Sequence, residues 1–316
     1  MLFSPNQMHI PDGFLSGIVS IVLWLVSIAV LAIALRKTNK TLGDREIPLM
    51  GVLAAAIFAG QMLNFSITGG TSGHLLGAAL ATILLGPWSA VLVLTSVVAI
   101  QALIFQDGGL LALGANIFNM AIVGVFSANL VYTLIRKVSM GKSWSILVGG
   151  FVAAWTSIFI ASLAAALELS ISGTSPANLS IPAMGGIHAL IGIGEGLITT
   201  GALAFIYASR RDLFTPEKAE AGTGKLVLIA GGILTLILAI LSPLASSHPD
   251  GLEWVAEQQG FIEKAQEAVY NLIPDYTFPG IDNPTLSTII AGVIGAILVF
   301  GVAFTVAKLQ KKQAAN

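Results

Sequence analysis

Long apolar runs, interrupted by short polar segments, occupy most of the chain. A helix needs about 20 apolar residues to cross a bilayer, and nine runs approach or reach that length. The predicted spans lie at roughly 14–35, 47–63, 74–86, 88–106, 113–135, 146–168, 186–208, 226–243 and 285–307. The third run is short and ends at Gly86-Pro87, so we expect a half-span or a strongly kinked helix there.

Composition supports a membrane protein. Hydrophobic residues make up 55% of the 316 residues and charged residues 10%, whereas soluble domains carry about 25% charged residues. The lipid bilayer must therefore surround most of the chain. The net charge of −1 gives no reason to expect a nucleic-acid partner. Cysteine is absent, so any metal site must use nitrogen or oxygen donors.

The basic residues predict an orientation. If nine spans alternate, residues 36–46, 136–142, 209–225 and 308–316 lie on one side of the membrane. These segments hold every lysine and arginine of the chain's 15 except Lys264. Because cytoplasmic loops are enriched in lysine and arginine, this side is predicted to be cytoplasmic. The N-terminus is then outside and the C-terminus is in the cytoplasm.

The pattern as a whole predicts an all-α polytopic membrane protein with two units. Residues 8–208 form a seven-helix bundle, and the polar residues 209–225 form a cytoplasmic linker. Residues 226–316 form a two-helix hairpin with a long outside loop near 244–284. Acidic residues dominate this loop and would concentrate cations at the outer face. An ordinary solvated loop would explain most of the same pattern.

Three of the four histidines, His9, His74 and His188, fall at the predicted outer ends of spans, and His248 lies in the outside loop. A single histidine at such a place is usually a packed or interfacial residue. Three at one membrane face, beside other buried polar groups, favour a site for a transition-metal ion as strongly as ordinary packing.

His9 lies in the sequence Met8-His9-Ile10-Pro11-Asp12-Gly13, in which Pro-Asp-Gly predicts a turn before the first helix. If the chain started at Met8, its free amine, the amide nitrogen of His9 and His9 Nδ1 could chelate one ion in five- and six-membered rings. Such a planar nitrogen site suits Ni(II) or Cu(II). If Met1 is the first residue, this chelate cannot form. Whether residues 1–7 precede Met8 in the mature protein therefore decides whether this chelate can exist.

His74 follows a segment rich in glycine, serine and threonine, which begins at Asn64 and includes Ser72. Irregular backbone at membrane depth is tolerated only where protein or water satisfies its polar groups, so this segment could fold back into the bundle. His74 would then supply a fourth nitrogen to the ion. Otherwise it is an interfacial histidine at the start of a helix.

His188 and Glu195 are seven residues apart, so they share one helical face, with Glu195 about 10 Å deeper. Glu195 is the only acidic residue that we place inside a span, and such a carboxylate is a candidate for function. It could instead be structural, with Asn116 and Asn119 of the fifth span as its partners. The candidates for contacts around the ion or along its pathway are Asp12, Asn64, Ser72, Asn116, Asn119, His188 and Glu195.

Motifs for catalysis are missing from the sequence. Gly141-Lys142-Ser143 and Gly224-Lys225 resemble the ends of phosphate-binding loops, but both lack the earlier glycine. There is no His-Glu-x-x-His sequence of zinc proteases. We therefore expect a chain that has no ATPase of its own, no organic cofactor and no enzymatic activity.

Three motifs in order resemble the CbiM/NikM family, the substrate-capture components of energy-coupling-factor transporters for cobalt and nickel. They are MHIPDGFLSG at 8–17, SGHLLG at 72–77 and IHALIGIGEGLIT at 187–199. The second unit resembles CbiN/NikN and carries the PDGLE sequence at 249–253. The whole chain thus resembles the fused, two-component NikMN form.

This resemblance implies that the N-terminal segment inserts into the bundle and that Met8, His9 and His74 bind the metal. Residues 1–7 depart from the family's motif, so we interpret them as an extension from a misannotated start codon. Otherwise the extension must be removed, or the ligand set differs. The resemblance also implies a coupling membrane protein and a cytoplasmic ATPase pair as partners, in a prokaryotic inner membrane. The transported substrate would be Ni²⁺ or Co²⁺, and the planar nitrogen site favours Ni²⁺. The alternative hypothesis is a stand-alone secondary transporter that uses Glu195 as an ion relay.

Overall fold

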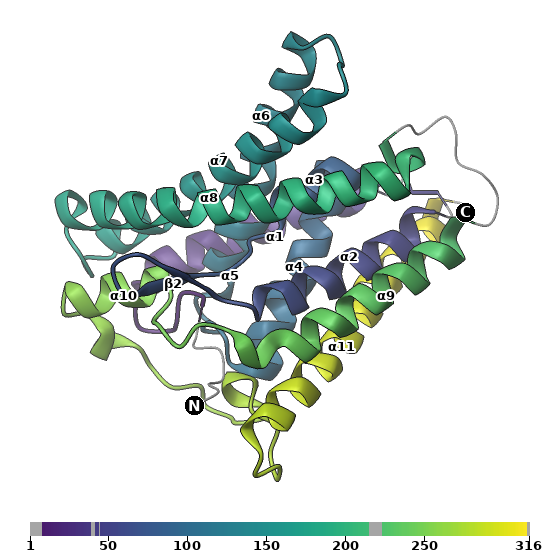
Figure 1. The fold of residues 1–316 in the computed structure, drawn as a ribbon. Helices are drawn as coiled ribbons and strands as arrows, with labels where there is room; N and C mark the ends of the chain where they lie inside the picture. Colours follow the sequence, from purple (N-terminus) through teal and green to yellow (C-terminus); the bar gives the residue numbers. More distant parts are fainter. Residues whose placement is uncertain (1–7, 39–41, 44, 215–222, 315–316) are drawn as a thin grey trace.

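The computed structural model describes residues 8–38, 42–43, 45–214 and 223–314. The predicted extension 1–7 and residues 215–222 of the predicted linker lie outside these residues. The described part of the chain is dominated by long helices, which confirms the prediction of an all-α polytopic membrane protein (Figure 1).

The principal helices are α1 Gly17–Thr38, α2 Glu46–Gln61, α3 Ala78–Leu85, α4 Pro87–Phe105, α5 Leu113–Asn116, a π-helix Ile117–Val123, α6 Gly124–Val138, α7 Trp144–Ile171, α8 Ala177–Ser209, α9 Thr223–Leu241, α10 Gly251–Gln258 and α11 Pro284–Ala314. Short 3₁₀ turns lie at Arg211–Phe214, Ser242–Leu244, Ile262–Lys264 and Pro274–Tyr276. Two short strands, β1 Phe65–Ile67 and β2 Thr71–Gly73, pair antiparallel.

Seven helices in the described ranges are long and apolar enough to cross a membrane. Helix α2 has 16 residues and α3 has only eight, so they are about 24 and 12 Å long, whereas the hydrocarbon core is about 30 Å thick. The run at 47–63 is therefore shorter than a full crossing, whereas the short third run at 74–86 agrees with the half-span that the sequence predicts. The third apolar run is a half-span that ends at Gly86, where φ is +76°.

The fifth predicted span consists of α5, the π-helix and α6 in continuous succession. The π-helix contains Asn119 and Met120, and Asn116 directly precedes it. One additional residue per turn rotates the side chains that follow, and such π segments occur frequently at functional sites. Here the segment turns both Asn119 and Met120 towards a pocket between the helices.

The second unit packs directly on the first. Helices α9 and α11 lie along α2, where glycines face large side chains (Figure 1). A Cβ atom on Gly51 would lie 2.8 Å from the Phe300 ring, and one on Gly295 would lie 2.2 Å from the Phe58 ring. The helix axes can approach this closely only because neither position carries a side chain.

The segment between α2 and α3 forms a hairpin of β1 and β2 instead of irregular backbone, and the chain then turns into the bundle. The second unit joins this hairpin, because the Ser72 amide donates to Pro249 O over 2.8 Å and Ser72 pairs with Asp250. Helix α10 follows at once and lies against β2 and α8. The interpretation of the 244–284 loop as fully solvated is therefore wrong at Asp250, which is 2% exposed.

Candidate metal centre

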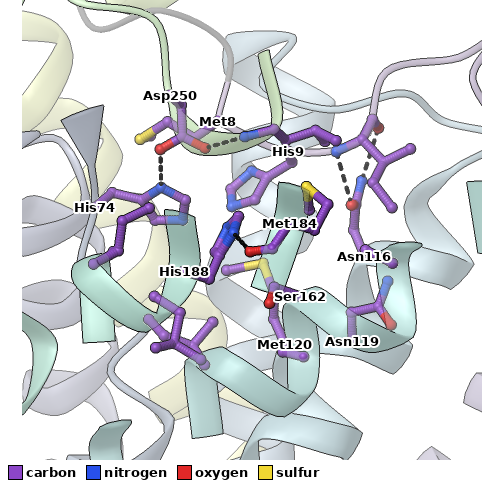
Figure 2. A pocket seen from close by; sticks show the side chains of 17 residues that line it. Met8, His9, His74, Asn116, Asn119, Met120, Ser162, Met184, His188 and Asp250 are labelled. Atoms are coloured by element: carbon purple, nitrogen blue, oxygen red, sulfur yellow. Dashed lines mark hydrogen bonds and ion pairs between the residues drawn. The ribbon is translucent and has the colours of Figure 1, made fainter. Parts of the chain in front are cut away.

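Residues 8–14, which we call the N-terminal hook, lie inside the protein beside the loop that joins α4 to α5. Met8, His9 and Ile10 are each at most 4% exposed. Asn116 holds the hook at Ile10: its Oδ1 accepts the Ile10 amide and its Nδ2 donates to the Ile10 carbonyl, both over 3.0 Å. Figure 2 shows this pair of hydrogen bonds beside the pocket.

Asp12 fixes the far end of the hook. Its carboxylate accepts the amides of Leu110 and Ala112 over 3.1 and 2.9 Å. Gly109 lies against the same turn and donates its amide to Ile10 O over 3.0 Å. The carboxylate of Asp12 therefore anchors the hook and does not face the pocket residues.

The three nitrogens of the predicted chelate converge on one oxygen atom, Oδ1 of Asp107. The Met8 nitrogen lies 2.7 Å from it, the His9 amide nitrogen 3.2 Å and His9 Nδ1 3.1 Å. In this chain the Met8 nitrogen belongs to a peptide bond, because seven residues precede it. The hook is thus folded so that all three atoms point to a common centre.

Asp107 was not among the residues that the sequence predicts, although it lies only two residues after the end of α4. Burial by itself raises the pKa of its carboxyl group, but the charge and hydrogen bond of His9, and further hydrogen bonds from Tyr276 and Met8, lower the pKa below its usual value. Asp107 therefore carries a negative charge at neutral pH. The Asp-Gly-Gly sequence after an apolar span signals a turn, but not a partner for the hook.

His74 faces the hook from the opposite side. Its ring lies edge-on to the ring of His9, with 5.6 Å between their centroids. Its Nδ1 lies 3.0 Å from Oδ1 of Asp250 in the second unit. Burial alone lowers the pKa of His74, but the charge and hydrogen bond of Asp250, with smaller effects of Asp107 and Glu195, raise it overall.

His188 lines the same pocket from α8. Its Nδ1 lies 2.8 Å from the carbonyl oxygen of Met184, so Nδ1 carries the proton and Nε2 is the acceptor nitrogen. Figure 2 shows His9, His74 and His188 gathered around the pocket, with Met120 and Met184 beside them. The cavity has a volume of about 70 Å³.

Glu195 does not line this pocket. It is fully buried, and its two oxygens accept the amides of Leu76 and Gly77 over 2.7 and 3.0 Å, at the start of α3. Asn116 and Asn119 are not its partners, which corrects that prediction: Asn116 holds Ile10 and Asn119 holds another carboxylate. Glu195 thus fixes the segment that carries His74.

That other carboxylate belongs to Glu168 of α7, which receives a hydrogen bond of 2.8 Å from Asn119 Nδ2. Glu168 is 6% exposed and lies near the end of a candidate span. The interpretation of Glu195 as the only acidic residue in a span is therefore wrong. Asn119 also lines the pocket.

The remaining predicted residues lie outside the pocket. Ser72 Oγ donates to the His248 carbonyl over 2.9 Å, and the His248 side chain is exposed. Asn64 is buried, and its carbonyl accepts the Ser246 amide over 2.8 Å. Both residues connect the first unit to the loop of the second unit.

Side chains alone do not form a metal site in the part of the chain that the structure describes. No group of three or more His, Cys, Asp or Glu side chains there is arranged to hold an ion. The acidic and imidazole groups form two separate pairs, His9 with Asp107 and His74 with Asp250. Backbone nitrogens of the hook are the additional donors that this pocket offers.

The fold and the pocket together define a multi-pass membrane protein whose helices enclose a histidine-lined, ion-sized cavity at one end of the bundle. The chain belongs to the CbiM family, because the family described as cobalt uptake substrate-specific transmembrane region matches residues 9–213. A second family, the PDGLE domain, matches residues 225–312. The resemblance seen in the three motifs is thus confirmed.

Relatives share this fused arrangement. The chain is 40% identical over 304 residues to the putative fused nickel transport protein NikMN of Archaeoglobus fulgidus, covering 95% of this chain and 98% of the relative. It is 29% identical to the fused nickel transport protein NikMN of Rhodobacter capsulatus, covering 92% and 95%. A crystal structure described as a transition metal transporter is 34% identical, with a TM-score of 0.57, and covers 71% of this chain and 99% of that chain.

Proposed function

We propose that the chain is the metal-capture component of an ATP-driven energy-coupling-factor importer, with Ni²⁺ as the favoured substrate and Co²⁺ as the other. The observation that carries this proposal is the convergence of the Met8 nitrogen, the His9 amide and His9 Nδ1 on one point within 3.2 Å. Amine, amide and imidazole donors at such a centre suit a planar Ni(II) complex.

The proposed ligand set is the Met8 amine, the amide and Nδ1 of His9, and the imidazole of His74. It requires that Met8 is the first residue of the mature protein. Metal binding to amine and amide nitrogens displaces protons, so these atoms would exchange their hydrogen bonds to Asp107 for bonds to the ion. Co²⁺ accepts similar donors, but both fused relatives described above are named as nickel transport proteins.

The proposed importer also needs further subunits. We infer that a coupling membrane protein and a cytoplasmic ATPase pair move the hook or the segment before α3 to release the ion. The first unit, 8–208, holds the ion, and the second unit, 226–316, follows the cytoplasmic linker 209–225. The protein would lie in a prokaryotic inner membrane with the N-terminus outside and the C-terminus in the cytoplasm.

Two variants test the ligand set. The chain that starts at Met8 should bind one Ni²⁺ in isothermal titration calorimetry. Adding Gly-Ser before Met8, or changing His74→Ala, should abolish stoichiometric binding because each removes one nitrogen donor. His248→Ala is the matched control, since His248 is exposed and should leave binding unchanged. Full binding by both test variants would refute the ligand set.

The alternative is a stand-alone secondary transporter that relays ions through Glu195. Both oxygens of Glu195 are already used by backbone amides, which favours a structural role. Proteoliposomes that hold only the purified chain distinguish the two functions. We expect no Ni²⁺ uptake without the ATPase subunits; sustained uptake driven by an ion gradient would support the alternative.

A further inference from the structure

Two side chains of the second unit reach the metal centre, one from each side. Asp250 Oδ1 lies 3.0 Å from Nδ1 of His74. The hydroxyl of Tyr276 donates to Oδ2 of Asp107 over 2.6 Å. His74 is itself a proposed ligand, and Asp107 holds the hook that carries the other three proposed donors. The second unit therefore contacts one proposed ligand directly and the other three through Asp107.

The contact of Asp250 determines which nitrogen of His74 faces the pocket. A carboxylate only accepts hydrogen bonds, so Nδ1 of His74 carries the proton and Nε2 keeps its lone pair. Metal-binding histidines commonly use one nitrogen for the ion and the other for a carboxylate or carbonyl. Asp250 is itself held in place, because Pro249 O accepts the Ser72 amide over 2.8 Å and Asp250 caps α10.

The contact of Tyr276 determines the orientation of Asp107. With Oδ2 occupied by the tyrosine hydroxyl, Oδ1 is the oxygen that receives all three nitrogens of the hook. Tyr276 is fully buried and stacks on Phe105 at 4.8 Å between ring centroids. Tyr276 and its neighbour Asp275 have φ of +55° and +48°, a costly conformation for residues other than glycine. The backbone is thus strained at the point that delivers the hydroxyl.

We propose that the second unit completes the metal centre, with Asp250 and Tyr276 as positioning residues. Asp250 orients His74, and Tyr276 holds Asp107 so that the hook is already folded, with its three nitrogens on one centre, before the ion replaces these hydrogen bonds. This inference rests on the proposed function and assigns to the second unit a direct effect on metal affinity. Removing either contact leaves the fold and the four nitrogen donors in the chain, but allows a ligand to rotate away from the centre. Loss of such outer contacts typically weakens metal binding by about 10- to 100-fold.

The test uses the full chain that starts at Met8, purified in detergent and titrated with Ni²⁺. Asp250→Ser keeps a residue that caps helices well but is too short to reach His74. Tyr276→Phe removes one oxygen atom from a ring that stays stacked on Phe105. Both variants should raise the Kd for Ni²⁺ by about 10- to 100-fold and change the Ni(II) ligand-field absorption spectrum, which reports the geometry of the donors.

Matched controls lie away from the pocket. Asp282→Ser changes an exposed aspartate of the same loop, and Tyr207→Phe changes a tyrosine of α8 that packs against Phe214. Both should bind Ni²⁺ as the wild type does. Wild-type affinity and spectrum in both Asp250→Ser and Tyr276→Phe would overturn the inference while the proposed function stands. If the wild type binds no Ni²⁺, the proposed function fails, and this inference fails with it.

Discussion

Gly109 is a residue whose importance becomes clear only in three dimensions. A Cβ atom at this position would lie 1.9 Å from Asp12 Oδ1 and 2.2 Å from the Asp12 amide nitrogen. Backbone atoms and an anchored carboxylate cannot move aside as a flexible side chain can. The hook therefore lies where it does because residue 109 has no side chain.

We expect Gly109→Ala to displace the hook and to weaken Ni²⁺ binding by about 10- to 100-fold, since overpacking typically costs about 1–3 kcal/mol. Gly186→Ala is the control, because a Cβ there meets nothing within 4 Å. Titration calorimetry of both variants checks the effect. Equal affinities for Gly109→Ala and the wild type would show that the hook does not need this close approach.

The proposed donors could be named from local sequence, but their partners in the structure could not. His9 and its neighbours could be recognised because a chelate depends on consecutive atoms along the chain. Asp107 and Asp250 approach these donors from positions 98 and 176 residues away. No periodicity or spacing relates such positions, so their contacts follow from tertiary packing alone.

The start of helix α3 connects the buried Glu195 to His74, because Glu195 fixes the backbone that carries this histidine. Glu195 of α8 receives the amides of Leu76 and Gly77 at the start of α3, where backbone N–H groups have no partners within the helix. His74 lies only two residues before this anchor. A glutamate in the middle of a span thus acts on the pocket through backbone hydrogen bonds.

Glu195→Gln should weaken Ni²⁺ binding by about tenfold or more. The amide can accept from one of the two N–H groups, but its NH₂ group then faces the other donor. Losing a buried hydrogen bond to a charged acceptor costs about 1.5–3 kcal/mol. Glu257→Gln on α10 is the exposed control. A proton relay predicts a different result, namely unchanged equilibrium binding with altered transport.

The long apolar helices were well predicted from the sequence, whereas the short elements were not. The apolar runs gave the long helices because about 20 hydrophobic residues in succession have few alternatives in a bilayer. The β1–β2 hairpin and α10 each depend on contact with the other unit. The π-helix at Ile117–Val123 changes the direction in which the Asn119 side chain points. Asn119 therefore binds Glu168, and not Glu195 as predicted.

At the scale of the whole molecule, the distribution of lysine and arginine predicts which end of the bundle faces the cytoplasm. The chain has no cysteine, so single introduced thiols can report this without background. Lys142→Cys lies in the exposed α6–α7 connection, and Val269→Cys lies in the loop of the second unit, where Val269 is 95% exposed.

We expect a membrane-impermeant thiol reagent to label Val269→Cys in intact cells and Lys142→Cys only after permeabilisation, because the positive-inside rule places Lys142 in the cytoplasm. Labelling is read by a mass shift of the purified protein. The reverse pattern would invert the orientation and would place the pocket on the cytoplasmic side.

The pairing of His74 with Asp250 also has a consequence for biosynthesis. The two residues are 176 positions apart, so the pair closes only after most of the chain has been made. Contacts between distant positions carry a large loop-closure cost and form late in folding. A ribosome that has produced only residues 8–208 has therefore made a membrane domain in which His74 still lacks its partner Asp250. Synthesis of the last third of the polypeptide supplies that partner.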